Sequence, residues 1–203
     1  LENRKAAWCV NGECRDDLLI ESFAKHLADA PLQDRVIVLH QEGSHGPAYY
    51  LRYPKAFERF TPTCDSNALQ SCTQQQVINT YDNTIAYTDH IIASAIKTLA
   101  HDSRYSSALI YASDHGESTG EHGLYLHGAP YVFAPSQQTH VPMLSWLSPD
   151  FAAREPAKAA CLRKRHGDEL SHDNIFHSML GLAGVQTAVH NPALDMSAGC
   201  SAQ

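Results

Sequence analysis

The spacing of hydrophobic positions along the chain predicts alternating helices and strands. Apolar residues at helical spacing predict three helices, over residues 15–29, 74–99 and 173–182, with Gly184 near the end of the last one. Compact apolar runs predict three strands, the first two of them buried, over residues 36–39, 108–112 and 141–147. Residues 48–73 follow neither pattern and are expected to be irregular. This alternation favours an α/β fold with a largely parallel sheet and helices on both faces.

Loops that contain glycine and histidine follow the first two expected strands. His45 lies in the loop after residues 36–39, and His115 lies in the loop after residues 108–112. In open α/β sheets, ligands bind at the carboxyl ends of the strands. The sequence therefore predicts a site where these loops meet.

Asp114 and His115 are the first candidates for chemistry. They offer one oxygen and one nitrogen ligand, which suits Zn²⁺ or Mn²⁺. Successive strand side chains point to opposite faces, so both reach one ion only if the chain turns, and Gly116 permits a turn. Taken alone, the pair is better read as a strand-end Asp beside a surface His. His45 and His127, each next to a glycine, favour a convergent site instead, because imidazole binds phosphate, ligates metals and moves protons.

Charge and hydropathy exclude two classes of protein. The net charge is −7, whereas nucleic-acid-binding proteins concentrate Lys and Arg, so we expect no nucleic-acid partner. The sequence contains no apolar run of about 18 residues, the length that a membrane-spanning helix needs.

The cysteines indicate an oxidising compartment. Four of the six form two close pairs that flank short polar loops, Cys9 with Cys14 and Cys64 with Cys72. This arrangement favours local disulfides. A zinc knuckle would need Cys-x-x-Cys spacing or His partners at fixed offsets, and neither loop has them. Cys161 and Cys200 remain, and the sequence leaves open whether they pair.

Several motifs resemble one family in their order along the chain. They are residues 39–50 (LHQEGSHGPAYY), 60–64 (FTPTC), 79–83 (NTYDN), 113–118 (SDHGES), 120–123 (GEHG), 125–128 (YLHG) and 141–144 (VPML). Together they resemble the lipid A phosphoethanolamine transferases, which include the mobile colistin-resistance enzymes and belong to the alkaline phosphatase/sulfatase superfamily. The resemblance covers roughly residues 8–185.

The resemblance implies roles for five of the residues in these motifs. Asp114 and His115 should be zinc ligands. His45 and His127 should contact the transferred phosphoethanolamine, a second zinc ion, or both. Glu117 should lie beside the metal, although a surface carboxylate fits its position equally well.

Other polar residues are not assigned catalytic roles. His122 stands where the family is expected to have Asn, so no role is carried over to it, and His140 precedes a strand and is expected to be structural. Asp82, Asn83 and Asp89 lie on the longest expected helix, where packing or a polar face explains them.

The resemblance also implies which parts of the enzyme lie outside this chain. The family uses a Thr nucleophile and a Glu zinc ligand that precede these motifs, behind an N-terminal membrane region, and nothing before Trp8 matches them. We therefore expect residues 1–203 to be the C-terminal part of a single periplasmic catalytic domain.

The implied function is zinc-dependent transfer of phosphoethanolamine from phosphatidylethanolamine to lipid A. It would act at the periplasmic face of the inner membrane of a Gram-negative bacterium and give resistance to polymyxins such as colistin. Two alternatives remain open. One is another enzyme of the superfamily, such as a phosphoglycerol transferase or a sulfatase-type hydrolase. The other is a non-catalytic module that binds metal or lipid.

Overall fold

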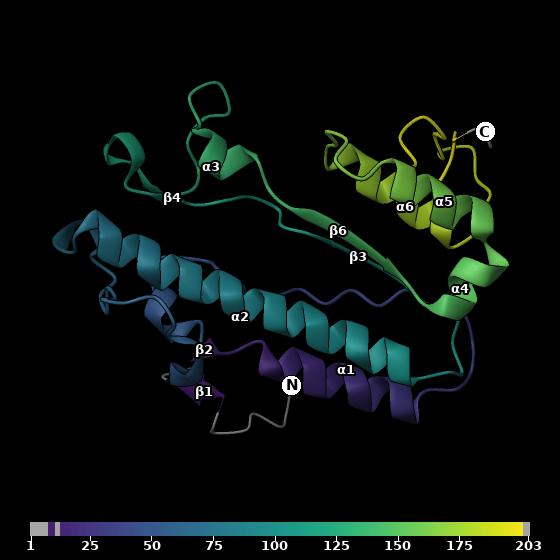
Figure 1. Cartoon of the computed structure of the whole chain (residues 1–203), viewed down its shortest axis with the longest axis horizontal. Coiled ribbons are helices and arrows are strands. Elements are labelled where there is room, and N and C mark those ends of the chain that lie inside the picture. The colour runs from purple at the N-terminus through teal and green to yellow at the C-terminus, as the bar shows by residue number, and fades with distance from the viewer. Residues whose placement is uncertain (1–7, 11–12, 201–203) are drawn as a thin grey trace. The chain divides into compact units, whose positions relative to one another are not determined.

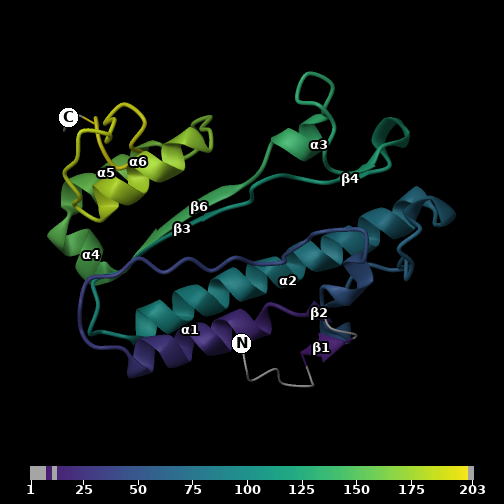
Figure 2. The same cartoon turned by 180° about the vertical axis from the view of Figure 1, so that it is seen from behind.

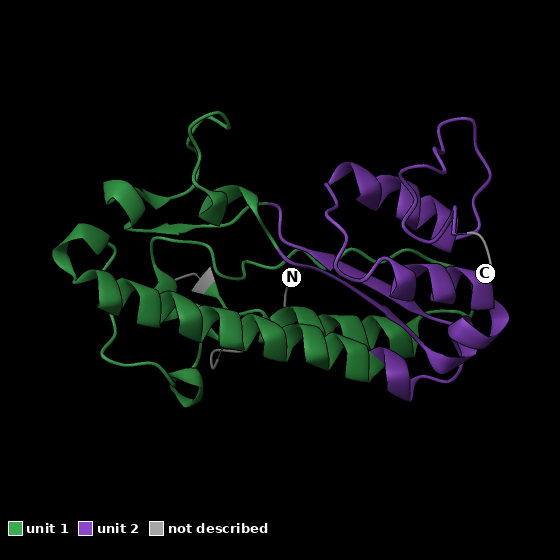
Figure 3. Cartoon of the chain, turned by 45° about the horizontal axis from the view of Figure 1, so that its top comes forward, with its two compact units in different colours: residues 1–98, 115–141 green, residues 99–114, 142–203 purple. Residues whose placement is uncertain are grey.

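The computed structural model describes residues 8–10 and 13–200 (Figure 1). The chain divides into two compact units (Figure 3). Unit 1 comprises residues 1–98 and 115–141, and unit 2 comprises residues 99–114 and 142–203.

Two helices that run side by side form the body of unit 1 (Figures 1 and 2). Helix α1 spans Asp17–Asp29 and helix α2 spans Gln74–His101, so both predicted helices are confirmed. Ile20 of α1 packs against Tyr87 and Ile91 of α2, and these two side chains are almost completely buried. Among the described residues, no helix is long and apolar enough to cross a membrane.

The segment between these helices is irregular, as predicted, and contains three short 3₁₀ turns: Tyr49–Leu51, Lys55–Phe57 and Leu69–Ser71. Irregular backbone leaves N–H and C=O groups that need partners. The fully buried Asn83 of α2 supplies them, because its Oδ1 accepts from the backbone N–H groups of Arg59 and Phe60 at 2.8 and 2.9 Å. The packing role expected for Asn83 is confirmed.

A small hydrophobic cluster in unit 1 lies beneath the loops that carry the histidines. Its buried members are Tyr49, Cys64, Leu69 and Val77, with Leu126 packed against them. Strand β4 (Ser118–Thr119) pairs antiparallel with β5 (Tyr125–Leu126), and the turn between them contains the 3₁₀ turn Glu121–Gly123. The short helix α3 follows at Ser136–Thr139. Near the N-terminus, β1 (Cys9–Val10) pairs with β2 (Glu13–Cys14).

Unit 2 is built on one antiparallel strand pair. Strand β3 (Ala108–Ala112) pairs along its whole length with β6 (Met143–Leu147), so two of the predicted strands are confirmed. Pro142 has no backbone N–H to donate to a neighbouring strand, which explains why β6 begins at Met143 and not at residue 141 as predicted. Every residue of β3 is half-buried, whereas a fully buried strand was predicted.

Three helices complete unit 2: α4 (Pro149–Arg154), α5 (Pro156–Lys164) and α6 (Asp173–Leu182). Helix α6 matches the predicted bounds. It ends at Leu182, and Gly184 follows two residues later as expected, with a φ of +67° in the left-handed region that favours glycine. The N–H groups of Gly184 and Val185 return to the carbonyls of Gly181 and Leu180, at 3.2 and 2.9 Å.

The expectation of a strand over residues 36–39 is wrong. These residues form no strand in the structure, and Val36 and Val38 are 63% and 77% exposed, whereas Ile37 and Leu39 are half-buried. β-branched residues favour a pleated surface, but a strand also needs a neighbour to pair with, and the described residues offer none here. The predicted parallel sheet depended on this strand. The described strands form three two-stranded antiparallel sheets instead, although the α/β class itself is confirmed.

All six cysteines are paired in disulfides. The structure confirms Cys9–Cys14 and Cys64–Cys72, and it also joins Cys161 to Cys200, the pairing that the sequence left open. The first two bonds lie in unit 1, and the third ties α5 to the C-terminal end of unit 2.

The Cys161–Cys200 bond is expected to be the most stabilising of the three. It joins residues 39 apart, and loop-closure entropy predicts a loss of about 4 kcal/mol when both are replaced by alanine. Replacement of Cys9 and Cys14, which are 5 apart, should cost only about 2 kcal/mol. Urea unfolding followed by circular dichroism measures both values, and the reverse order would contradict the entropic explanation.

Candidate metal centre

The first loop of the site carries His45, and hydrogen bonds to Asp16 fix its backbone. The buried Asp16 carboxylate accepts hydrogen bonds from the backbone N–H groups of Glu42 and Gly43, at 3.0 and 2.9 Å. Burial raises the pKa of Asp16, and these two hydrogen bonds oppose the rise. On the other side of the loop, the Arg52 guanidinium donates to the His45 carbonyl at 3.0 Å. The backbone around His45 is therefore fixed at both ends.

The second loop carries His115, and Gly116 is needed there for a different reason from the one predicted. The backbone of Gly116 is not in the left-handed region, but a Cβ atom at this position would lie 2.0 Å from the Gln137 carbonyl oxygen. The Gly116 N–H donates to the Gln138 carbonyl at 2.9 Å. The glycine thus permits close backbone packing. The His115 Nδ1 atom lies 3.0 Å from the Gly116 carbonyl oxygen, and a hydrogen bond from Nδ1 to this oxygen fixes the orientation of the ring.

The third loop places His127 directly after β5. Leu126, the last residue of that strand, has a φ of +65°, which costs an L-residue roughly 1–2 kcal/mol. Its side chain packs against the buried cluster around Tyr49, and this packing offsets the strain. Gly46 makes the close approach possible, because a Cβ there would lie 2.4 Å from the Leu126 side chain.

These three loops bring His45, His115 and His127 together. Each residue contributes one ring nitrogen to a group of three in which all the nitrogens lie within 4.8 Å of one another. The ring centroids of His115 and His127 are 3.8 Å apart, and His45 lies 5.0 Å from His127 and 6.0 Å from His115. His115 is half-buried, and the other two are exposed. We call these residues the three-histidine cluster. Neutral imidazoles at this spacing are a ligand set typical of Zn²⁺ and other first-row transition metals.

Glu117 links the loops of the cluster. It is 5% exposed, so the alternative of a surface carboxylate is wrong. The Glu117 Oε1 atom lies 2.9 Å from the His127 Nδ1 atom and also accepts a hydrogen bond from the Gly46 N–H at 3.4 Å. The Glu117 Oε2 atom accepts a hydrogen bond from the Tyr49 hydroxyl at 3.0 Å. Burial and the Glu117 charge raise the pKa of Tyr49, which keeps its hydroxyl protonated as a donor. A carboxylate that orients an imidazole in this way is typical of metal and catalytic sites.

Gln138 on α3 is a further support that the sequence did not reveal. Its side-chain amide is buried, donates to the Ser118 hydroxyl at 2.8 Å and accepts from the Ala129 N–H at 3.2 Å. Together with the bond from Gly116 to its carbonyl, these contacts tie α3 to the loops of His115 and His127.

The remaining predicted residues take different places. Asp114 belongs to unit 2 and His115 to unit 1, so the geometry above is that of the three histidines. His122 and His140 are exposed, and neither belongs to a metal-binding group among the residues described. Asp82 is half-buried and Asp89 is exposed on α2, as expected for a polar face.

Comparison with known families identifies the family to which the chain belongs. A family model described as "Sulfatase" matches residues 2–185. The chain belongs to the sulfatase family. The superfamily that the sequence motifs suggested is thereby confirmed.

Similar proteins within this family carry transferase names. The chain is 51% identical over 197 residues to phosphoethanolamine transferase EptA of Salmonella typhimurium, covering 95% of this chain and 35% of that protein. It is 46% identical over 174 residues to phosphatidylethanolamine transferase Mcr-1 of Escherichia coli, covering 85% and 31%. The integral membrane protein lipooligosaccharide phosphoethanolamine transferase A of Neisseria meningitidis matches with a TM-score of 0.90 and 42% identity, covering 95% and 36%. The chain thus spans about a third of the length of these proteins.

Substitution of Glu117 tests whether it positions His127. The Glu117→Gln variant is expected to lower the activity that depends on the three-histidine cluster by about 10–100-fold, because the amide replaces the charged partner of the imidazole. Glu121→Gln is the matched control. The Glu121 carboxylate accepts hydrogen bonds from the Thr119 N–H and hydroxyl, and among the described residues Glu121 is not a member of the three-histidine cluster, so activity should stay close to wild type. Equal losses in the two variants would contradict the positioning role.

Proposed function

We propose that this chain forms part of a zinc-dependent enzyme that transfers phosphoethanolamine from phosphatidylethanolamine to lipid A. The observation that carries the proposal is the three-histidine cluster, oriented by the buried Glu117. Support comes from the similar proteins, which are named phosphoethanolamine or phosphatidylethanolamine transferases. The family name also fits a sulfatase-type hydrolase, which would release the phosphoethanolamine group without modifying lipid A.

The donor set suits zinc. Asp114 and His115 would hold the ion, as adjacent oxygen and nitrogen ligands. When bound, zinc would neutralise phosphate charge and lower the pKa of an attacking hydroxyl. The hydrogen bond from His115 Nδ1 to the Gly116 carbonyl supports this role, because it directs Nε2 away from the backbone.

His45 and His127 would act on the phosphoethanolamine group itself. The Glu117 carboxylate holds the Nδ1 side of His127, so the Nε2 atom is the one that faces outward to donate to a phosphate oxygen or move a proton. His45 lies beside it on a loop that Asp16 and Arg52 fix, so the two imidazoles bind one phosphate group without reorganisation.

The proposed location is the periplasmic face of the inner membrane of a Gram-negative bacterium. Three disulfides support an oxidising compartment. We propose that the chain is the C-terminal part of one catalytic domain, attached to the membrane through a preceding region, as the match to part of an integral membrane protein supports. Lipid A with an added amine cation attracts cationic peptides less, which would give resistance to colistin.

Removal of the metal tests the zinc requirement. Dialysis of the longer protein against a chelator is expected to abolish transfer to lipid A, and zinc should restore it, because the ion supplies the main charge stabilisation. The fold should survive, since disulfides and two hydrophobic clusters stabilise unit 1 independently of metal. Transfer that continues with less than about one-tenth of a zinc ion per chain would contradict the proposal.

A further inference from the structure

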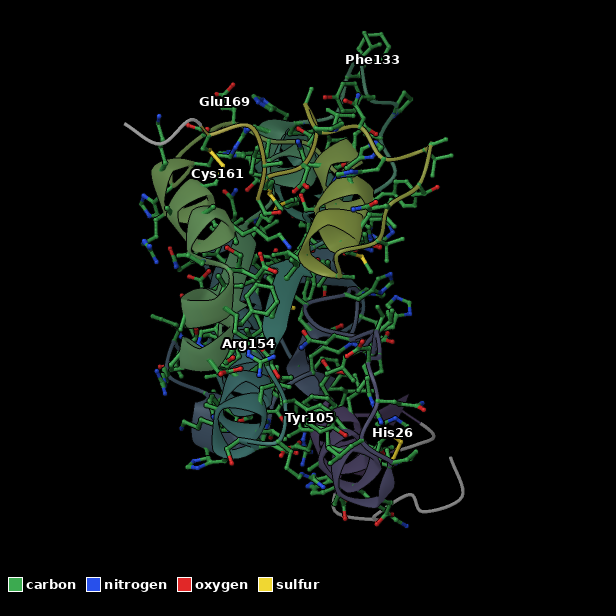
Figure 4. All side chains as sticks on the ribbon, turned by 90° about the vertical axis from the view of Figure 1, so that its right-hand side faces the viewer. His26, Tyr105, Phe133, Arg154, Cys161 and Glu169 are labelled. Atoms are coloured by element: carbon green, nitrogen blue, oxygen red, sulfur yellow. A yellow bond between two sulfur atoms is a disulfide. The ribbon has the colours of Figure 1, made fainter. Side chains whose placement is uncertain are left out.

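An uncharged apolar loop tip follows the three-histidine cluster along the chain. Tyr131, Val132 and Phe133 are 85%, 85% and 79% exposed. Figure 4 shows the Phe133 ring at the tip of this loop, directed away from the ribbon. We call residues 130–135 the apolar loop. It lies in unit 1 together with the cluster, and it begins three residues after His127.

The apolar loop has a defined shape. The N–H groups of Phe133 and Ala134 both donate to the Pro130 carbonyl, at 2.8 and 2.9 Å, which closes a turn. Proline stands at each end of the loop, at positions 130 and 135. The preceding residue, Ala129, donates to the buried Gln138 side chain, which also bonds to Ser118 at the base of the His115 loop. The three apolar side chains are therefore presented to solvent by the same framework that positions the histidines.

The charge pattern indicates what such a tip contacts. Between Glu121 and Asp150 the sequence contains no Asp, Glu, Lys or Arg, so inserting the loop into an apolar phase desolvates no charged side chain. The net charge of −7 opposes attraction to anionic lipid, so contact with a membrane would have to come from apolar burial. Tyr and Phe also suit the boundary between headgroups and acyl chains.

We propose that the apolar loop inserts into the surface of a phosphatidylethanolamine-containing bilayer beside the active site. The proposal rests on the proposed function, in which donor and acceptor are both lipids whose phosphates lie at that surface. Insertion of Tyr131 and Phe133 holds the loop of His127 at the level of the headgroups. The phosphate then reaches the cluster while the acyl chains stay in the bilayer.

Vesicle binding by the 203-residue chain tests the proposal without any need for catalysis. The chain is sedimented with vesicles of phosphatidylethanolamine and phosphatidylglycerol, in the presence of a chelator, at about 0.1 M and about 0.5 M salt. Wild type is expected to bind at least as strongly at the higher salt concentration, because salt screens the repulsion between the acidic chain and anionic lipid. The double variant Tyr131→Ser with Phe133→Ser should bind at least roughly tenfold more weakly, because it lacks the two aromatic side chains that become buried in the bilayer. Phe176→Ser, which alters a phenylalanine that is 52% exposed in unit 2, is the matched control and should bind like wild type.

Four results would overturn the proposal: no vesicle binding by wild type, undiminished binding by the double variant, equal loss in the control, or binding that disappears at high salt. Light scattering without vesicles provides a further check. A wild-type dimer that the double variant dissociates would show that the loop binds a second copy of the chain. Because zinc is absent throughout, a failure of transfer leaves this result standing, and a failure of vesicle binding leaves the proposed transfer chemistry intact.

Discussion

Replacement of His115 by alanine in the longer protein is expected to remove tightly bound zinc and to reduce phosphoethanolamine transfer below detection. The proposed site has one ligand fewer in this variant, and the remaining ligands match the charge and geometry of the ion poorly. Asp114→Ala should give the same result. His115 is half-buried within the three-histidine cluster, so its loss also opens the space that orders the other two rings.

Zinc content by elemental analysis, measured beside turnover on phosphatidylethanolamine, checks this prediction. His122→Ala is the matched control, because His122 is exposed and lies outside the cluster, so both quantities should match wild type. Circular dichroism confirms that each variant is folded. Normal zinc content in either Asp114→Ala or His115→Ala would show that these residues do not hold the required ion.

Replacement of His45 or His127 by alanine is expected to separate zinc binding from catalysis. Each variant should keep one tightly bound zinc ion and lose a factor of about 10²–10⁴ in transfer rate, the usual effect of losing a group that binds phosphate or moves a proton. The larger loss is expected for His127, because Glu117 orients it and its removal leaves a buried carboxylate without that partner. His140→Ala should be near wild type, since His140 is exposed and outside the cluster.

The same experiment distinguishes the two interpretations of the cluster. If His45→Ala or His127→Ala loses its zinc together with its activity, that histidine is a metal ligand, and the ring nitrogens within 4.8 Å are a coordination sphere. If zinc is retained and the rate is unchanged, neither imidazole takes part in transfer. Only retained zinc with a slow rate agrees with roles on the substrate.

Local sequence patterns predicted α1, α2 and α6 because their signal is periodic, whereas the shorter helices α3, α4 and α5 were not predicted. Helix α2 repeats apolar residues at helical spacing over many turns, and α6 adds Gly184, whose left-handed backbone ends the helix. The segment at residues 36–39 shows the limit of such reasoning. Its β-branched composition indicates an extended chain, but whether a strand forms depends on a neighbour that composition cannot reveal.

The convergence of the three histidines was predictable from the sequence, whereas the residues that support their loops were not. His45, His115 and His127 each stand beside a glycine, and this repeated pairing correctly indicated that their loops converge. Tyr49, Asp16 and Gln138 carry no local signal, because their contacts join residues far apart in sequence: Tyr49 donates to Glu117 across 68 positions. Gly116 was predicted to permit a turn. In the structure it instead permits close packing against the Gln137 backbone, and its φ is not in the left-handed region.

Mass spectrometry of lipid A tests the central claim most directly. The longer protein, loaded with zinc, is incubated with phosphatidylethanolamine and lipid A in detergent micelles. The proposed function predicts lipid A with an added phosphoethanolamine group, in an amount equal to the diacylglycerol formed. Release of free phosphoethanolamine with unmodified lipid A would instead identify a hydrolase and would contradict the account.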